Sequence, residues 1–176
     1  SVDMDLDRRA GWLSREDLEQ ARERLPILYV DAVPVRVNAV GAVTHVGLLL
    51  RAMPDGSISR AIVSGRVQYG ERVRDALMRH IEKDLGTLAL PRIAASASAW
   101  PPGTNRSGAT SLQPGGRTST HWHRMPCEGD CVPSQGALEF SWLTPEECAS
   151  SDVRAETTGG QDRLVMAALA HVGLLP

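Results

Sequence analysis

The sequence predicts an α/β fold in one domain, because segments with the pattern of strands are interleaved with segments with the pattern of helices. Three stretches rich in β-branched and apolar residues are predicted to be strands: 27–38, 43–51 and 58–63. Two stretches, 71–85 and 164–172, carry apolar residues at helical spacing. At 176 residues, the chain is long enough to bury a hydrophobic core.

Capping residues mark two further helix starts. Ser14 can accept a hydrogen bond from a backbone N–H, and Asp17 stands at the third helical position of a capping box. This helix is expected to end before Pro26. Thr144, followed by a proline and two glutamates, predicts another helix start directly after a strand at 137–143.

The composition argues against nucleic-acid and membrane partners. The 19 basic and 21 acidic residues are spread evenly and give a net charge of −2, whereas a nucleic-acid surface would show clustered Lys and Arg. No apolar run approaches the roughly 18–20 residues of a membrane span. The N-terminal residues lack the layout of a signal peptide, and three cysteines fit a reducing compartment. We therefore expect a cytoplasmic protein, and the sequence leaves open whether it forms a homodimer.

The loop and helix at 65–86 resemble the Nudix box. That box is a Gly, five residues, a Glu, seven residues, then Arg-Glu, an apolar residue, any residue, Glu-Glu, any residue and Gly. In this chain Gly65, Glu71, Arg79, Asp84 and Gly86 match it in register. Two segments also resemble an actinobacterial Nudix-like group of unassigned function: 25–31 and 63–67.

This resemblance implies a Nudix-type α/β/α sandwich with a mixed sheet, and hydrolysis of small molecules in which a nucleoside diphosphate is linked to another group. Mg²⁺ or Mn²⁺ would be the cofactor, because metal ions bridge phosphate oxygens as water attacks phosphorus. The resemblance implies three sets of site residues: catalytic Glu71, Arg79 and His80; metal-binding Asp84 and Glu71; and a phosphate-binding loop with Gly65, Arg66 and Gly70.

The helix has nevertheless lost most of the carboxylates that this chemistry needs. The three ligand positions are occupied by His80, Lys83 and Asp84. An ammonium group repels a cation, and a neutral imidazole is a poor ligand for magnesium. We therefore expect weak metal binding and weak or lost hydrolysis. The alternative is a non-catalytic nucleotide-binding or protein-interaction module on the same fold.

Three box residues also have structural interpretations. Glu71 could simply be an acid favoured at a helix N-terminus, as readily as a ligand or a scaffold. Arg79 is expected to form an ion pair that braces the preceding loop rather than to lie on a solvated face. Asp84 falls close to the apolar stripe of the helix, so it needs a partner, which would be a metal ion, Lys83 or Arg79.

A second candidate metal site lies outside the box. The side chains of His121, His123, Cys127 and Cys131 are chemically suited to zinc. Their spacing differs from that of a standard zinc finger, and low-complexity sequence flanks them. Zinc binding is therefore the less favoured interpretation.

The stretch 94–126 has an unusual composition for a folded domain. It contains no Val, Ile or acidic residue and four large apolar residues: Trp100, Leu112, Trp122 and Met125. Such a stretch buries too little apolar area to offset its ordering entropy. We therefore expect an irregular or mobile insertion that supplies no sheet strands. A compensated reading-frame shift in the gene is an alternative, because the Nudix-like pattern resumes on both sides, and the nucleotide sequence would test it.

Overall fold

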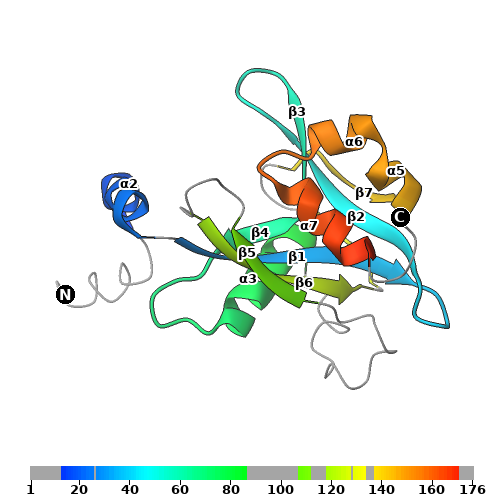
Figure 1. Ribbon diagram of the computed structural model, residues 1–176, viewed down its shortest axis with the longest axis horizontal. Helices are drawn as coiled ribbons and strands as arrows, with labels where there is room; N and C mark the ends of the chain where they lie inside the picture. The colour runs from blue at the N-terminus through cyan, green and yellow to red at the C-terminus, as the bar shows by residue number, and fades with distance from the viewer. Residues whose placement is uncertain are drawn as a thin grey trace.

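The computed structural model contains one mixed sheet with helices on both faces (Figure 1). It describes these residues: 13–25, 27–86, 107–111, 118–127, 129–133 and 137–170. The helices are α2 (Arg15–Arg24), α3 (Val73–Leu85), α5 (Pro145–Ala149), α6 (Ser151–Glu156) and α7 (Gln161–Ala170). The strands are β1 (Ile27–Val37), β2 (Val43–Ala52), β3 (Ile58–Ala61), β4 (Val63–Arg66), β5 (Ser107–Ser111), β6 (Thr118–Pro126) and β7 (Glu139–Leu143).

Strand β1 organises the sheet. Along one edge it pairs in parallel with β6, and its other edge is shared between β4 and β2, both antiparallel to it. Strand β2 continues the sheet through β3 and β7, and β5 pairs with β6. The predicted strand at 58–63 is thus divided between β3 and β4, which pair with different neighbours. This division matters for the site, because it delivers the chain from β4 into the loop before α3.

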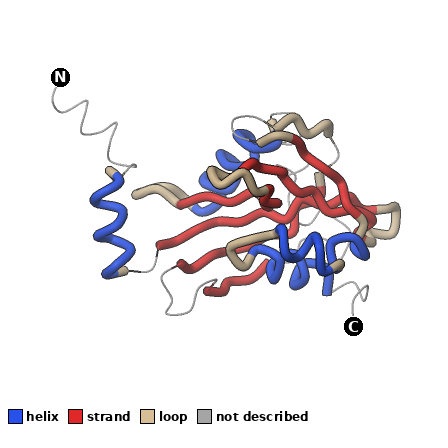
Figure 2. Tube along the Cα trace, turned by 90° about the horizontal axis from the view of Figure 1, so that it is seen from above, coloured by secondary structure: helices blue, strands red, loops and turns tan. Residues whose placement is uncertain are grey.

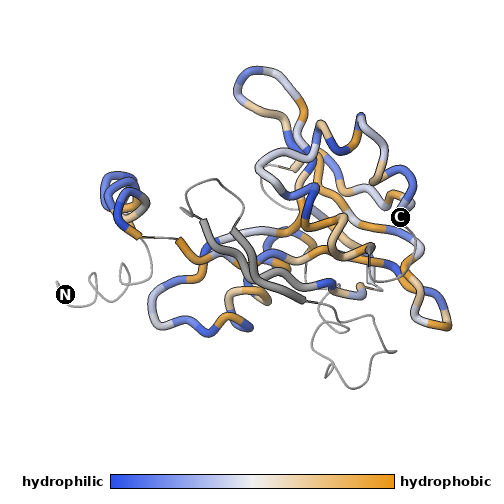
Figure 3. Tube along the Cα trace, viewed as in Figure 1, coloured by the Kyte–Doolittle hydropathy of each residue, from blue (hydrophilic) through white to orange (hydrophobic). Residues whose placement is uncertain are grey.

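Two cores form on the two faces of the sheet, as the alternation of side chains along a strand requires. From β1, Val30 and Ala32 pack toward α3, whereas Val33 and Val35 pack toward α7. Figure 2 shows these helices on opposite sides of the strands, with α2 beyond one end of the sheet. Hydrophobic residues follow the central strands, while α2 is largely hydrophilic (Figure 3). The predicted α/β/α sandwich is therefore confirmed.

The expectation that 94–126 supplies no sheet strands is wrong in two places. Strand β6 pairs along the length of β1, from Ile27 to Val35, and β5 pairs with β6. Sheet pairing satisfies backbone groups and does not require large apolar side chains. Met125 adds to the core under α3, and the fully buried Arg124 donates a hydrogen bond to the carbonyl of Ala168. The remainder of this stretch, including Trp100 and Leu112, lies outside the described residues.

The helix starts follow the predicted caps. The Ser14 hydroxyl accepts a hydrogen bond from the Asp17 N–H, and Thr144 does the same for Glu147. The short helix α6, capped by Ser150, was not expected from the sequence. Helix α7 begins at Gln161, and the end of the predicted helical stretch 164–172 falls outside the described residues. Within the described part of the chain, no helix has the length and apolar character to cross a membrane.

Candidate functional site

The loop between β4 and α3 is braced by an ion pair. Nε of Arg79 donates to Oε1 of Glu71 at 2.8 Å, and Nη2 donates to Oε2 at 2.9 Å. Oε2 also accepts the N–H of Gln68, and Nη2 of Arg79 reaches the carbonyl of Arg66 at 3.1 Å. The hydrogen bond from Arg79 is the main cause that lowers the pKa of Glu71. The ion pair expected for Arg79 is therefore present, and Glu71 uses both oxygens to hold the loop.

His80 clamps the start of the same loop. Its Nε2–H donates to the carbonyl oxygen of Arg66 at 2.9 Å, and its ring lies against Gly65, where a Cβ would overlap it. The side chain is buried, and this burial lowers the pKa of the imidazole, so the neutral ring is favoured. Its Nδ1 has no hydrogen-bond partner among the described residues. The geometry favours a structural role for His80, and a catalytic one stays a prediction.

Asp84 lies on the core-facing side of α3 and has an ion-pair partner that the sequence did not indicate. Its side chain is only 1% exposed, and Nη2 of Arg51, on β2, lies 3.6 Å from Oδ1. Neither carboxylate oxygen accepts a hydrogen bond within the described structure. Burial raises the pKa of the Asp84 carboxyl, against the opposing charges of Lys83 and Arg51. Arg51 is therefore an ion-pair partner of Asp84, while Arg79 pairs with Glu71 instead.

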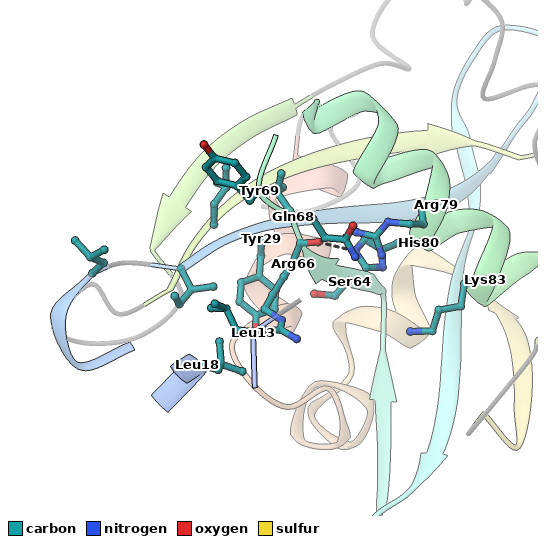
Figure 4. A pocket seen from close by; sticks show the side chains of 15 residues that line it. Leu13, Leu18, Tyr29, Ser64, Arg66, Gln68, Tyr69, Arg79, His80 and Lys83 are labelled. Carbon is teal, nitrogen blue, oxygen red and sulfur yellow. Dashed lines mark hydrogen bonds between the residues drawn. The ribbon is translucent and has the colours of Figure 1, made fainter. Parts of the chain in front are cut away.

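A cavity of about 460 Å³ opens beside the loop (Figure 4). An apolar wall includes Leu13, which precedes the cap of α2, Leu18 on α2 and Tyr29 on β1. The loop and α3 supply a polar wall, whose charged or titratable members are Arg66, Arg79, His80 and Lys83. Among the residues that the structure describes, no aspartate or glutamate lines the cavity. The site thus offers a positively charged surface and an apolar surface to one ligand.

The predicted site residues are only partly brought together. Of the phosphate-binding loop, Gly65 and Arg66 line the cavity, whereas Gly70 does not. Gly70 adopts a φ of 72°, a left-handed conformation that favours glycine. Neither of the two expected metal ligands, Glu71 and Asp84, lines the cavity. Sequence spacing alone could not separate the residues that face the cavity from those that support it.

The described residues do not fit a magnesium site of the Nudix kind. Magnesium is held by carboxylates, phosphates and water. At two of the three ligand positions the cavity wall carries His80 and Lys83, and the third, Asp84, is buried beside Arg51. Across the described ranges, no three His, Cys, Asp or Glu side chains are grouped so that they could hold a metal ion.

The zinc hypothesis is not tested by this structure. The side chains of His121 and His123 lie outside the described residues, although both belong to β6. Cys127 is buried, which raises the pKa of its thiol to about 12 and disfavours the thiolate that zinc requires.

The segment after Cys127 is held by Arg36, which donates to the carbonyls of Cys127 and Gly129 at 2.9 and 3.1 Å. Arg36 also lies over the ring of Trp142 at 4.4 Å, a contact the sequence did not indicate.

Comparisons with known proteins agree with this fold. The family model described as "Domain of unknown function (DUF4916)" matches residues 8–174. A crystal structure from Jonesia denitrificans, described as a possible asymmetric diadenosine tetraphosphate hydrolase, is 51% identical. The match covers 87% of this chain and 98% of that one, with a TM-score of 0.71. No curated protein matches the chain significantly.

More distant solved structures share only their fold with this chain. A bifunctional NMN adenylyltransferase/ADP ribose pyrophosphatase from Francisella tularensis, complexed with AMP and a manganese ion, is 14% identical with a TM-score of 0.61. That match covers 90% of this chain and 46% of the other. The E. coli dihydroneopterin triphosphate pyrophosphohydrolase is 15% identical with a TM-score of 0.53, over 81% of this chain and 94% of that one. These are structures of Nudix hydrolases, so the predicted Nudix fold is confirmed.

Proposed function

We propose that this chain, which belongs to the DUF4916 family and has the Nudix fold, binds small molecules containing a nucleoside diphosphate and hydrolyses them weakly or not at all. The relative from Jonesia denitrificans supports this ligand class, because diadenosine tetraphosphate contains linked nucleoside phosphates. The cavity supports it as well, since positive charge suits phosphate and the apolar wall suits a nucleoside.

The observation that carries the proposal is the identity of the groups on α3 that face the cavity. His80 and Lys83 stand where the Nudix box has two carboxylates. Catalysis of phosphoryl transfer depends mainly on positioning and on neutralising charge, so the loss of ligands acts on the main catalytic term. The loop architecture is retained, because Glu71 and Arg79 hold it together. Because the loop is retained and the metal-binding carboxylates are lost, the site is better suited to binding a nucleotide derivative than to hydrolysing it.

The test measures binding and hydrolysis with the same ligands. ADP-ribose and diadenosine tetraphosphate are added to the whole chain with Mg²⁺ or Mn²⁺, and products are separated by chromatography. An active ADP-ribose pyrophosphatase serves as the positive control. We expect calorimetric binding of at least one ligand and little or no product. Multiple turnover at the rate of the control enzyme would contradict the loss of activity. If neither ligand binds, the proposed ligand class is wrong.

The same proposal includes two weaker consequences. Mg²⁺ or Mn²⁺ is expected to bind weakly, because Lys83 places a positive charge at a ligand position.

A cytoplasmic location is proposed from the cysteine content, and cell fractionation with an antibody against the chain would test it. Recovery of the chain from a membrane or secreted fraction would contradict that location.

A further inference from the structure

We infer that Tyr69 stacks on the aromatic base of the ligand, and that Leu13, Leu18 and Leu25 form the apolar wall of the same subsite. The inference rests on the proposed ligand class and adds which residues recognise the nucleoside. The apolar side of the cavity then selects diphosphates that carry a base over those that do not, whichever groups hold the phosphates.

Aromatic residues are scarce in this chain, and both of its tyrosines line the cavity. Aromatic residues make up 4% of the sequence, and the two tyrosines are Tyr29 and Tyr69. Phe140 and Trp142, by contrast, pack against the core under α3, with their ring centroids 5.0 Å apart. Core packing accounts for those two rings. It does not account for Tyr69, which is 89% exposed.

The rim of the cavity is apolar and open to water. Eight large apolar side chains are exposed in the part of the chain that the structure describes, and three of them line this cavity: Leu13 (49% exposed), Leu25 (64%) and Tyr69. Single exposed apolar side chains are ordinary on a protein surface, whereas a group of them around a cavity marks a ligand or interaction site. A flat aromatic base would cover this area, and the removal of the area from water would favour binding.

Helix α2 offers its apolar side chains to the cavity and not to the core. Leu18 is partly buried and lines the cavity, while the charged residues on either side of it, Asp17 and Glu19, are exposed. Among the residues that the structure describes, neither core includes Leu13, Leu18 or Leu25. In Figure 4, Leu18 and Tyr69 lie at opposite ends of the lining, with Tyr29 between them. The space between α2 and the loop is therefore the place for the base.

The loop fixes the backbone on both sides of Tyr69. The N–H of Gln68 donates to the carboxylate of Glu71 at 2.9 Å, and the N–H of Glu71 donates to the carbonyl of Gln68 at 3.1 Å. Gly70, with its φ of 72°, lies within this turn. An exposed ring on a fixed backbone can change rotamer to cover a base without a change in the loop. Stacking uses the π-face that every base has, so the presence of a base should matter more than its identity.

The experiment is a calorimetric titration of the whole chain with ADP-ribose, ADP and ribose 5-diphosphate, the last two of which differ only in the adenine base. We expect ADP to bind about fivefold to a hundredfold more tightly than ribose 5-diphosphate, the range that one stacked base contributes. Tyr69→Ala should remove most of this difference without weakening the binding of ribose 5-diphosphate. Tyr69→Phe, which keeps the ring, should retain the difference.

A matched pair of leucines tests the apolar wall. Leu25→Ala truncates a leucine that is 64% exposed and lines the cavity, and Leu138→Ala truncates one that is 63% exposed and does not line it. We expect the first change to weaken the binding of ADP and the second to leave it unaltered. Equal affinities of the two variants for ADP would overturn the role of this wall.

The outcomes separate this inference from the proposed function. If ADP-ribose binds, but the preference for ADP over ribose 5-diphosphate is absent or persists in Tyr69→Ala, the role of Tyr69 is overturned and the ligand class stands. If sedimentation shows that Tyr69→Ala changes the oligomeric state and leaves the affinity for ADP unchanged, the rim contacts a second copy of the chain and the inference is wrong. If ADP-ribose does not bind, the proposed ligand class fails and the inference fails with it.

Discussion

The imidazole ring of His80 lies directly against Gly65, the first glycine of the box, and leaves no room for a Cβ there. The ring is also tied to the next residue, because its Nε2–H donates to the carbonyl oxygen of Arg66. A planar ring that donates one hydrogen bond fits this narrow space. Position 80, where the Nudix box has a metal-binding glutamate, thus serves here to fix the loop to the helix.

Gly65→Ala should therefore destabilise the protein, by about 1–3 kcal/mol, because the new methyl group overlaps the ring of His80. Urea unfolding measures this loss. In a His80→Ala background the same substitution should cost little, since the ring that it would strike is gone. An equal loss in both backgrounds would show that the contact between these two residues is not the cause.

Glu71→Gln should lower the free energy of unfolding at neutral pH by about 1–3 kcal/mol, because it removes a charged acceptor from Arg79. The pKa of Glu71 is lowered in the folded protein from its ordinary value of 4.5. The stabilising contribution is thus complete above that ordinary value and is lost as the pH falls through the lowered folded pKa. Urea unfolding at several pH values should show the difference between the two proteins shrinking on acidification. A difference that is constant with pH would argue against this ion pair.

Asp84→Asn should have the opposite effect and raise the free energy of unfolding at neutral pH, by roughly 1 kcal/mol. The pKa of Asp84 is raised from its ordinary value of 3.8, so folding favours the protonated form. The contribution of protonated Asp84 to the free energy of unfolding is then complete below that ordinary value, and it is lost as the pH rises through the folded pKa. Glu82→Gln, an exposed change on the same helix, should have little effect. A destabilised Asp84→Asn would mean that the ion pair with Arg51 outweighs the cost of burial.

Much of the fold could be predicted from the sequence because its signals are local. The side chain of Ser14 caps α2, and the apolar residues at helical spacing in 71–85 became α3, which begins at Val73. The strand pairing of β5 and β6 could not be predicted in this way. These strands form through backbone hydrogen bonds to distant partners, and the composition of 94–126 gives no sign of them.

In the candidate site, too, local relationships could be predicted from the sequence and contacts between distant segments could not. The resemblance predicted that Arg79 forms an ion pair bracing the loop, but the sequence did not name Glu71 as its partner. Helical geometry placed Asp84 near the apolar stripe, but its partner Arg51 lies on β2, which sequence spacing along a helix cannot indicate. The cavity wall from α2 was missed for the same reason, since Leu13 and Leu18 meet the loop only in the folded chain.

The central claim is that His80 and Lys83 have replaced the metal-binding carboxylates of the Nudix box. His80→Glu with Lys83→Glu would restore acids at both positions, on one helix with Asp84. Because His80 is buried against Gly65, circular dichroism must first show that the double variant is folded, and Lys83→Glu alone is a milder second variant.

Calorimetric titration with Mg²⁺ compares these proteins most directly. We predict weak binding, or none that can be measured, to the original chain, and affinity that rises from Lys83→Glu to the double variant. Micromolar affinity for Mg²⁺ in the original chain would contradict the account, because it would require ligands other than these positions.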